Sequence, residues 1–174
     1  MTETRHILIC GDVGVGKSSL IRRLSDASGR PVCGFVTLRR SDGNGKYSVY
    51  IHPAQSKRRT YTPANRVGIC NSDGGIHFPA VFNTCGVPLL KAEEGRVIMM
   101  DELGFMENEA ELFRAAVLST LDGNIPVIAA VKNQSTPFLD AVRSHKNADL
   151  FIINNRNREK LYTELLPRVM AWDK

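Results

Sequence analysis

The fold of this chain is decided by the stretch Gly11-Asp12-Val13-Gly14-Val15-Gly16-Lys17-Ser18, which fits the phosphate-binding pattern G-x-x-x-x-G-K-[ST] at every fixed position. An apolar run at residues 7–10 precedes it and suits a buried parallel strand. Residues 18–24 follow it and carry apolar side chains at helical spacing. Strand, glycine-rich loop and helix therefore occur in the order that a phosphate-binding loop requires.

The residue types of this loop explain how it would hold phosphate. Glycines allow successive backbone N–H groups to turn inward, and the start of the helix adds unpaired N–H donors and the positive end of its dipole. Lys17 would place a charge on the terminal phosphates, and the Ser18 hydroxyl would ligate Mg²⁺. We therefore predict Mg²⁺ as cofactor and a nucleotide site formed by Gly11, Asp12, Val13, Gly14, Val15, Gly16, Lys17, Ser18 and Ser19.

A second motif, Arg96-Val97-Ile98-Met99-Met100-Asp101-Glu102, is an apolar strand that ends in two acids. Such a strand is typical of the Walker B element, in which the aspartate holds the hydration shell of Mg²⁺. Asp101 is thus predicted as a metal residue together with Ser18. Glu102 is the candidate that accepts a proton from the attacking water or orients it, and the alternative for Glu102 is a solvated acid at a strand end.

Composition is ordinary for a globular chain of 174 residues, with 43% hydrophobic and 24% charged residues. We expect a single domain over residues 1–174. No apolar run approaches the roughly 20 residues that span a bilayer, and residues 1–6 do not resemble an export signal, so we expect a cytoplasmic protein without a membrane partner. Four cysteines without C-x-x-C spacing argue against a zinc or disulfide framework.

The net charge of +5 permits a nucleic-acid partner but does not favour one, because the basic residues are dispersed. Their one local cluster is Lys57-Arg58-Arg59, followed by Tyr61. It is either a contact site for a polyanion or a solvated loop, and we favour the loop. We expect a monomer whose partner is a nucleoside triphosphate.

Alternating strand and helix patterns predict an α/β fold with three layers and a mostly parallel sheet. Strands are expected near 6–10, 97–101, 126–131 and 150–153, and 32–38 with 46–51 suggests an antiparallel hairpin. Helices are expected at 17–27, at 81–91 with a break near Pro88, at 108–121, at 136–145 and from 157 to 172 with a disturbance at Pro167. Residues 52–80 are expected to form loops and short strands over the nucleotide.

Several strings, taken together, resemble the small P-loop nucleoside triphosphatases, a family with thermophile and vertebrate members. Besides the loop at 11–18, they are Gly34-Phe35-Val36-Thr37-Leu38-Arg39, Asp101-Glu102-Leu103-Gly104-Phe105-Met106-Glu107, Ile125-Pro126-Val127-Ile128-Ala129-Ala130, Pro137-Phe138-Leu139-Asp140 and Asn157-Arg158-Glu159. The resemblance implies a RecA-like domain that slowly hydrolyses several nucleoside triphosphates with Mg²⁺. It also implies that Asn157 and Arg158 frame the base or ribose.

One position departs from this resemblance. The family usually has lysine where this chain has Phe105, so rate or nucleotide preference is expected to differ if that lysine neutralises charge. An arginine supplied from the same chain would also stabilise the transition state. Arg39 is the catalytic candidate for that role, and its alternative is a surface arginine of the hairpin.

Two other classes of function remain open. A nucleotide or small-molecule kinase shares the phosphate-binding loop, and the basic segment 52–66 keeps an arginine-rich lid possible. An ATP-dependent switch associated with nucleic acid is the other, although Val131-Lys132-Asn133-Gln134 lacks the Asn-Lys-x-Asp string that reads guanine. Phosphate release without an acceptor would favour hydrolysis over both.

Overall fold

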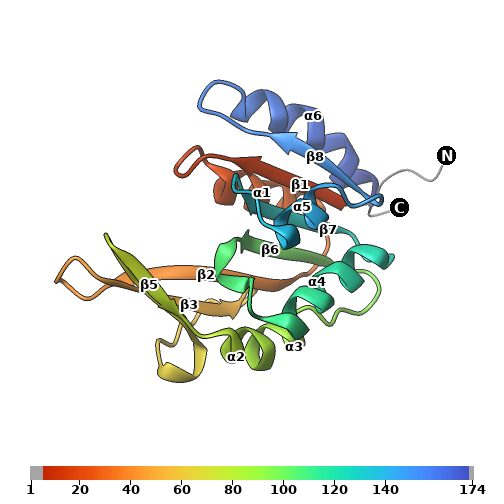
Figure 1. Ribbon diagram of the computed structural model, residues 1–174. Coiled ribbons are helices and arrows are strands. Elements are labelled where there is room, and N and C mark those ends of the chain that lie inside the picture. The colour runs from red at the N-terminus through yellow and green to blue at the C-terminus, as the bar shows by residue number, and fades with distance from the viewer. Residues whose placement is uncertain (1–5, 173–174) are drawn as a thin grey trace.

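Eight strands form one mixed sheet in the order β5-β4-β3-β2-β6-β7-β1-β8 (Figure 1). The computed structural model describes residues 6–172, so residues 1–5, on which the expectation of no export signal rests, lie outside the described part. Five neighbouring strands pair in parallel: β2 (Val32–Ser41), β6 (Val97–Leu103), β7 (Val127–Lys132), β1 (His6–Gly11) and β8 (Ala148–Ile152). The mostly parallel sheet predicted from the alternating pattern is thus confirmed.

The sheet continues beyond β2 as an antiparallel extension. It contains β3 (Tyr47–Pro53), β4 (Arg66–Asn71) and β5 (Gly74–His77). The hairpin of β2 and β3 was expected, but the pairing of β4 and β5 was not, because residues 52–80 contain glycines and prolines that obscure a strand pattern. β3 pairs with β2, the last parallel strand, and residues of both parts of the sheet belong to one core cluster.

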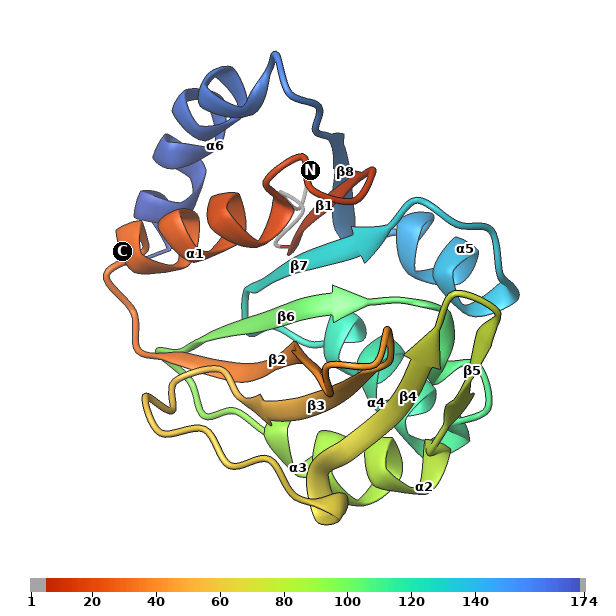
Figure 2. The ribbon, with the colours of Figure 1, turned by 90° about the vertical axis from the view of Figure 1, so that its left-hand side faces the viewer.

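Helices cover both faces of the sheet and complete three layers (Figures 1 and 2). On one face α1 (Lys17–Ala27) packs beside α6 (Arg158–Ala171), and their apolar side chains join those of the sheet in one core cluster. The other face is covered by α4 (Glu111–Asp122), α5 (Pro137–Arg143) and the short helices α2 (Pro79–Val81) and α3 (Val87–Leu89). No helix within residues 6–172 has the length and apolar character needed to cross a membrane.

Three expected helix details differ in the structure. A π-helical turn, Phe82–Gly86, joins α2 to α3, and Pro88 lies near the start of α3 without a break there. The next helix, α4, begins at Glu111 because a 3₁₀ turn, Phe105–Glu107, comes first. Pro167 lies inside an uninterrupted α6. By contrast, Thr136 caps α5 by accepting a hydrogen bond from the Leu139 N–H, as a Thr-Pro helix start predicts.

The parallel strands end on one edge of the sheet, and this edge positions the site. β1 runs into the loop that precedes α1, while β6 ends at Leu103 and β7 at Lys132. Because β1 and β6 both pair with β7, the loop and the acids of β6 meet at the same edge.

Candidate active site

The phosphate-binding loop has the backbone that its glycines predict. Gly14 and Gly16 have φ values of 81° and 99°, in the left-handed region that side chains with a Cβ disfavour. Gly16 directly precedes α1, so the first N–H groups of the helix open onto the loop. The Lys17 ammonium donates to the carbonyl oxygens of Gly11 and Asp12, both at 2.8 Å, and is therefore held across the loop.

Asp101 lies beside the start of α1. The Ser18 hydroxyl donates to Oδ1 of Asp101 at 2.7 Å, and a guanidinium nitrogen of Arg22 lies 3.4 Å from Oδ2. Burial raises the pKa of Asp101, while the Ser18 hydrogen bond and the charge of Arg22 oppose that shift. Two oxygen donors at this spacing suit a hard divalent cation, which takes oxygen ligands.

Glu102 faces the same cavity as its neighbour Asp101, although adjacent residues of a strand normally point to opposite faces. The pairing of β6 with β7 shifts register between Asp101 and Leu103, and this irregularity lets both carboxylates reach one side. Oε2 of Glu102 lies 3.3 Å from Nζ of Lys17. Thr37 holds the backbone at this irregularity of β6. Its hydroxyl donates to the Asp101 carbonyl oxygen at 3.3 Å and accepts from the Glu102 N–H at 3.4 Å.

Lys132 brings a second cation to Glu102 from the end of β7. Its Nζ lies 3.9 Å from Oε1 of Glu102 and 4.8 Å from the centre of the Phe105 ring, and its side chain is mostly buried. Glu107 lines the same cavity as Glu102 and Lys132, and it accepts a hydrogen bond from the Gly104 N–H at 3.1 Å. Complete burial raises the pKa of Glu107 to about 7, against the lowering effects of that hydrogen bond and of the charge on Lys132.

These groups line a cavity of about 420 Å³ over the phosphate-binding loop. Its walls come from the loop, from β2 and β3, from the end of β6 with its 3₁₀ turn, and from β7. Its polar and charged lining residues are Lys17, Ser18, Ser19, Thr37, Arg39, Asp101, Glu102, Glu107 and Lys132. A volume of this order accommodates a small phosphorylated ligand.

The structure brings most of the predicted residues to this edge and gives some of them local partners. Arg39 lines the cavity, with its guanidinium 4.9 Å from the centre of the Tyr47 ring. Val13 is 78% exposed on the loop, whereas Val15 is buried in the core. Asp12 accepts a hydrogen bond from the Asn133 side chain at 3.3 Å.

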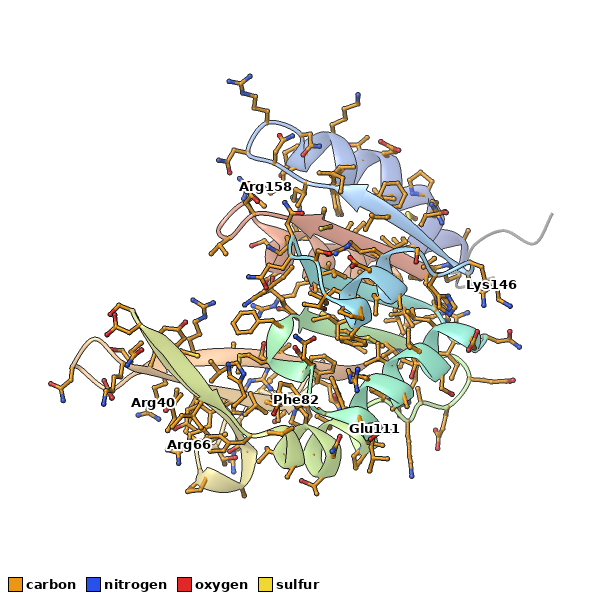
Figure 3. The ribbon with its side chains drawn as sticks, in the orientation of Figure 1. Arg40, Arg66, Phe82, Glu111, Lys146 and Arg158 are labelled. Carbon is orange, nitrogen blue, oxygen red and sulfur yellow. The ribbon has the colours of Figure 1, made fainter. Side chains whose placement is uncertain are left out.

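The two residues predicted near the base lie at the start of α6. Asn157 is engaged within its own turn: its Oδ1 accepts from the Asn154 N–H at 2.8 Å, and its Nδ2 donates to the Ile152 carbonyl oxygen at 2.9 Å. Arg158 reaches toward the phosphate-binding loop (Figure 3). A Cβ placed on Gly16 would lie only 2.7 Å from its Nη1, so the guanidinium packs against the loop backbone.

Four residues of the site were absent from the sequence prediction: Arg22, Thr37, Glu107 and Lys132. Arg22 lies one helical turn after Ser18, a spacing that places both on one face of α1. Lys132 ends an apolar strand, as Asp101 does, and the sequence pattern places both at the carboxyl edge of the sheet without giving Lys132 a role. Thr37 and Glu107 lie in the strings that carry the family resemblance, but their roles depend on the tertiary contacts that bring them to the acids.

Within residues 6–172, no group of three or more His, Cys, Asp or Glu side chains is arranged to hold a metal ion. Cys10, Cys33, Cys70 and Cys85 are free thiols.

A lysine and a serine on a strand–loop–helix motif, facing two acids at the end of a neighbouring parallel strand, define a P-loop NTPase. The chain belongs to the NTPase family, whose model matches residues 6–166. Membership in this family implies a divalent metal cofactor and a nucleoside triphosphate substrate.

Named relatives and solved structures agree with this assignment. The chain is 31% identical to nucleoside-triphosphatase THEP1 of Thermotoga maritima, with 92% of each chain covered. It is 27% identical to the cancer-related nucleoside-triphosphatase of Homo sapiens, covering 96% of this chain and 97% of that one. The crystal structure of THEP1 from Aquifex aeolicus matches with a TM-score of 0.73 at 21% identity, over 94% of this chain and 98% of that one. The solution structure of a human cancer-related nucleoside triphosphatase matches with a TM-score of 0.67 at 25% identity, over 96% and 98%.

Proposed function

We propose that this chain hydrolyses nucleoside 5′-triphosphates to diphosphate and phosphate, with Mg²⁺ as the cofactor, slowly and with broad base specificity. The observation that carries this proposal is the contact between Lys17 and Glu102, 3.3 Å apart, next to the contact of Ser18 with Asp101. The phosphate-binding lysine, the candidate water-orienting carboxylate and the predicted Mg²⁺ site thus adjoin one another. The named relatives are themselves nucleoside triphosphatases.

Lys17 and the loop N–H groups would bind the phosphates. The lysine is already oriented by two carbonyl oxygens, so little side-chain entropy remains to be lost when it contacts the terminal phosphates. The N–H groups and the ammonium would stabilise the charge that develops on the transferring group and on the leaving oxygen.

Ser18 and Asp101 would hold the cation, the serine through its hydroxyl and the aspartate through a water ligand. When bound, Mg²⁺ neutralises charge on the β- and γ-phosphates. Asp101 is 4% exposed and already has the Ser18 hydroxyl at 2.7 Å, so both oxygens are oriented before a ligand arrives.

Glu102 would orient the attacking water. Its carboxylate lies between the ammonium groups of Lys17, at 3.3 Å, and Lys132, at 3.9 Å, and these two contacts fix its position in the cavity. Its side chain is only 23% exposed, so few bulk waters compete for the same carboxylate.

Lys132 would supply the positive charge that the family resemblance places at position 105. Phe105 carries no charge, but Nζ of Lys132 lies 4.8 Å from its ring centre and 3.9 Å from Glu102. A cation from the end of β7 thus reaches the neighbourhood of the missing lysine. We propose that it performs the same charge neutralisation.

Broad base specificity is supported by the state of Asn157. Both ends of its amide are engaged in the turn before α6, so these hydrogen bonds hold the side chain in that turn and oppose its reorientation toward a base edge. Slow turnover would follow from the position of Arg39, because its guanidinium lies 4.9 Å from the centre of the Tyr47 ring and would have to leave that ring to reach a transferring phosphate. The cavity is lined by several elements of this one chain, among them the phosphate-binding loop, β2, β6 and β7, which supports a single domain that functions as a monomer.

The kinase alternative required a basic lid from residues 52–66. The segment at 54–59 instead lines a different cavity, on the α1 face of the sheet. Phosphate release from several triphosphates without an added acceptor is the experiment that tests hydrolysis against phosphoryl transfer.

A further inference from the structure

A second cavity, of about 480 Å³, lies away from the phosphate-binding loop. Its lining includes Arg22 and Ser25 of α1 and residues of the segment 54–59 that follows β3. Figure 2 shows α1 and the loop that follows β3 on the same side of the molecule. Its floor is apolar and is formed by sheet residues such as Val36 and Met99. The segment 54–59 and α1 are far apart in the sequence, so tertiary packing creates this cavity.

The charge of this cavity is predominantly positive. Its lining includes three cations, Arg22, Lys57 and Arg59, and one acid, Asp26. No ion pair within residues 6–172 joins Asp26 to any of the three, and Lys57 has no ion-pair partner among the described residues. Arg59 is held in place because its Nη1 donates to the Pro53 carbonyl oxygen. Among the described residues, Lys57 and Arg59 are therefore cations without an ion-pair partner, whereas Arg22 has Asp101 as its partner.

A buried hydroxyl adds a second, independent feature. Ser25 lines the cavity and is 1% exposed, and its Oγ has no hydrogen-bond partner among the described residues. A buried polar atom without a partner costs free energy and is uncommon in folded proteins. A ligand oxygen that accepts from this hydroxyl would remove that cost.

We propose that this cavity is a second binding site, which takes a phosphate group either free or as the phosphomonoester of a small metabolite. Arg22, Lys57 and Arg59 would supply its positive charge, and Ser25 would donate a hydrogen bond. Phosphate offers several strong acceptor oxygens and between one and two negative charges near neutral pH, which match this set of donors. The inference does not depend on the proposed hydrolysis, because binding at this cavity involves none of the residues assigned to the reaction.

Arg22 connects this second site to the first. Its guanidinium lines the cavity and also lies 3.4 Å from Oδ2 of Asp101, the predicted metal residue. A phosphate that pairs with Arg22 would compete with Asp101 for the Arg22 guanidinium. Occupancy of the second site would thus free the Asp101 carboxylate and strengthen the binding of Mg²⁺ with nucleotide.

The test is a calorimetric titration of the full chain with inorganic phosphate and, separately, with glucose 6-phosphate. Lys17→Ala removes the principal phosphate contact of the first site and should retain this binding. Wild type saturated with ADP and Mg²⁺ serves the same purpose if Lys17→Ala does not fold. Lys57→Glu should weaken binding about fivefold or more, whereas Lys91→Glu, an exposed lysine after α3, should not.

Ser25→Ala distinguishes a ligand contact from a structural role. It should weaken phosphate binding about tenfold while leaving the melting temperature unchanged or higher, because it removes an unpartnered hydroxyl. A stronger response to glucose 6-phosphate than to inorganic phosphate would identify a metabolite as the ligand, and the reverse would identify free phosphate. The proposal is overturned if wild type binds neither probe, if Lys17→Ala and ADP both abolish binding, or if Lys57→Glu binds as tightly as Lys91→Glu.

Discussion

The ammonium of Lys17 lies 3.3 Å from the Glu102 carboxylate, so the phosphate-binding lysine and the candidate water-orienting acid form an ion pair. The same ammonium is held by the carbonyl oxygens of Gly11 and Asp12. A terminal phosphate that approaches Lys17 must therefore share or displace the Glu102 carboxylate. Substrate binding and the orientation of the acid are coupled through this one contact.

Glu102→Gln should bind nucleoside triphosphate more tightly than wild type while losing turnover. The neutral amide no longer competes with phosphate for Lys17, and like-charge repulsion with the phosphates disappears. We expect about three- to tenfold tighter binding, since Glu102 is partly exposed and a contact with a partly solvated carboxylate contributes about 1 kcal/mol. Titration with a fluorescent nucleotide analogue measures this, with Glu109→Gln as a control for loss of an exposed acid. Weaker binding by Glu102→Gln would contradict the coupling.

Lys132→Met should lower kcat about tenfold or more, because it removes a cation from the neighbourhood of Glu102 and Phe105. The sharper test moves the charge within the site. Phe105→Lys in the Lys132→Met background should restore much of the lost turnover, since it returns a lysine to the position where the family has one. Full activity of Lys132→Met alone, or no recovery in the double variant, would show that Lys132 does not take that role.

Glu107 should make the stability of the protein depend on pH. Its folded pKa, about 7, is above its ordinary value of 4.5, so the folded chain keeps a proton that the unfolded chain releases between these pH values. The free energy of unfolding contributed by this group is thus present below about pH 4.5 and is lost as pH rises to about 7. Urea denaturation of wild type and Glu107→Gln at pH 5 and pH 8 should show the variant gaining about 3 kcal/mol relative to wild type at the higher pH. A difference that stays constant with pH would refute this assignment.

Two arginines should affect different kinetic constants. Arg158 packs against the Gly16 backbone, so Arg158→Ala should raise KM for triphosphate by about tenfold and change kcat little. Arg39 lines the cavity wall and is the candidate for stabilising the transition state, so Arg39→Ala should lower kcat. Arg40→Ala is the matched control, because the guanidinium of Arg40 lies over Tyr61 instead. Steady-state phosphate release gives both constants, and unchanged kcat in Arg39→Ala would remove Arg39 from the catalytic residues.

The loop from Gly11 to Ser18 and the strand that ends in Asp101 were predictable because each is a local pattern, in which an apolar run is followed by a fixed set of polar residues. The bounds of α1, Lys17–Ala27, agree with that expectation. Lys132 was harder to assign, since its importance depends on which strand pairs with β6, and strand order is a long-range property. The register shift that turns Glu102 toward Lys17 is likewise invisible in the sequence.

The antiparallel extension was likewise hard to predict from the sequence. Its strands β4 and β5 contain Gly68, Gly74 and Gly75, and glycine weakens the alternating pattern by which a strand is recognised. Pairing with β3 stabilises these strands in the fold. The basic cluster around Lys57 was expected to be a solvated loop, yet its position across from Ser25 on α1 follows only from tertiary packing.

The most direct test is phosphate release from ATP, GTP, CTP and UTP with Mg²⁺, with no other acceptor present, by wild type and by Glu102→Gln. Slow release from all four by wild type, together with its loss in the variant, is the predicted result. It would establish a nucleoside triphosphatase in which Glu102 activates water. Release at the wild-type rate by Glu102→Gln, or tight nucleotide binding by wild type without any release, would contradict that mechanism.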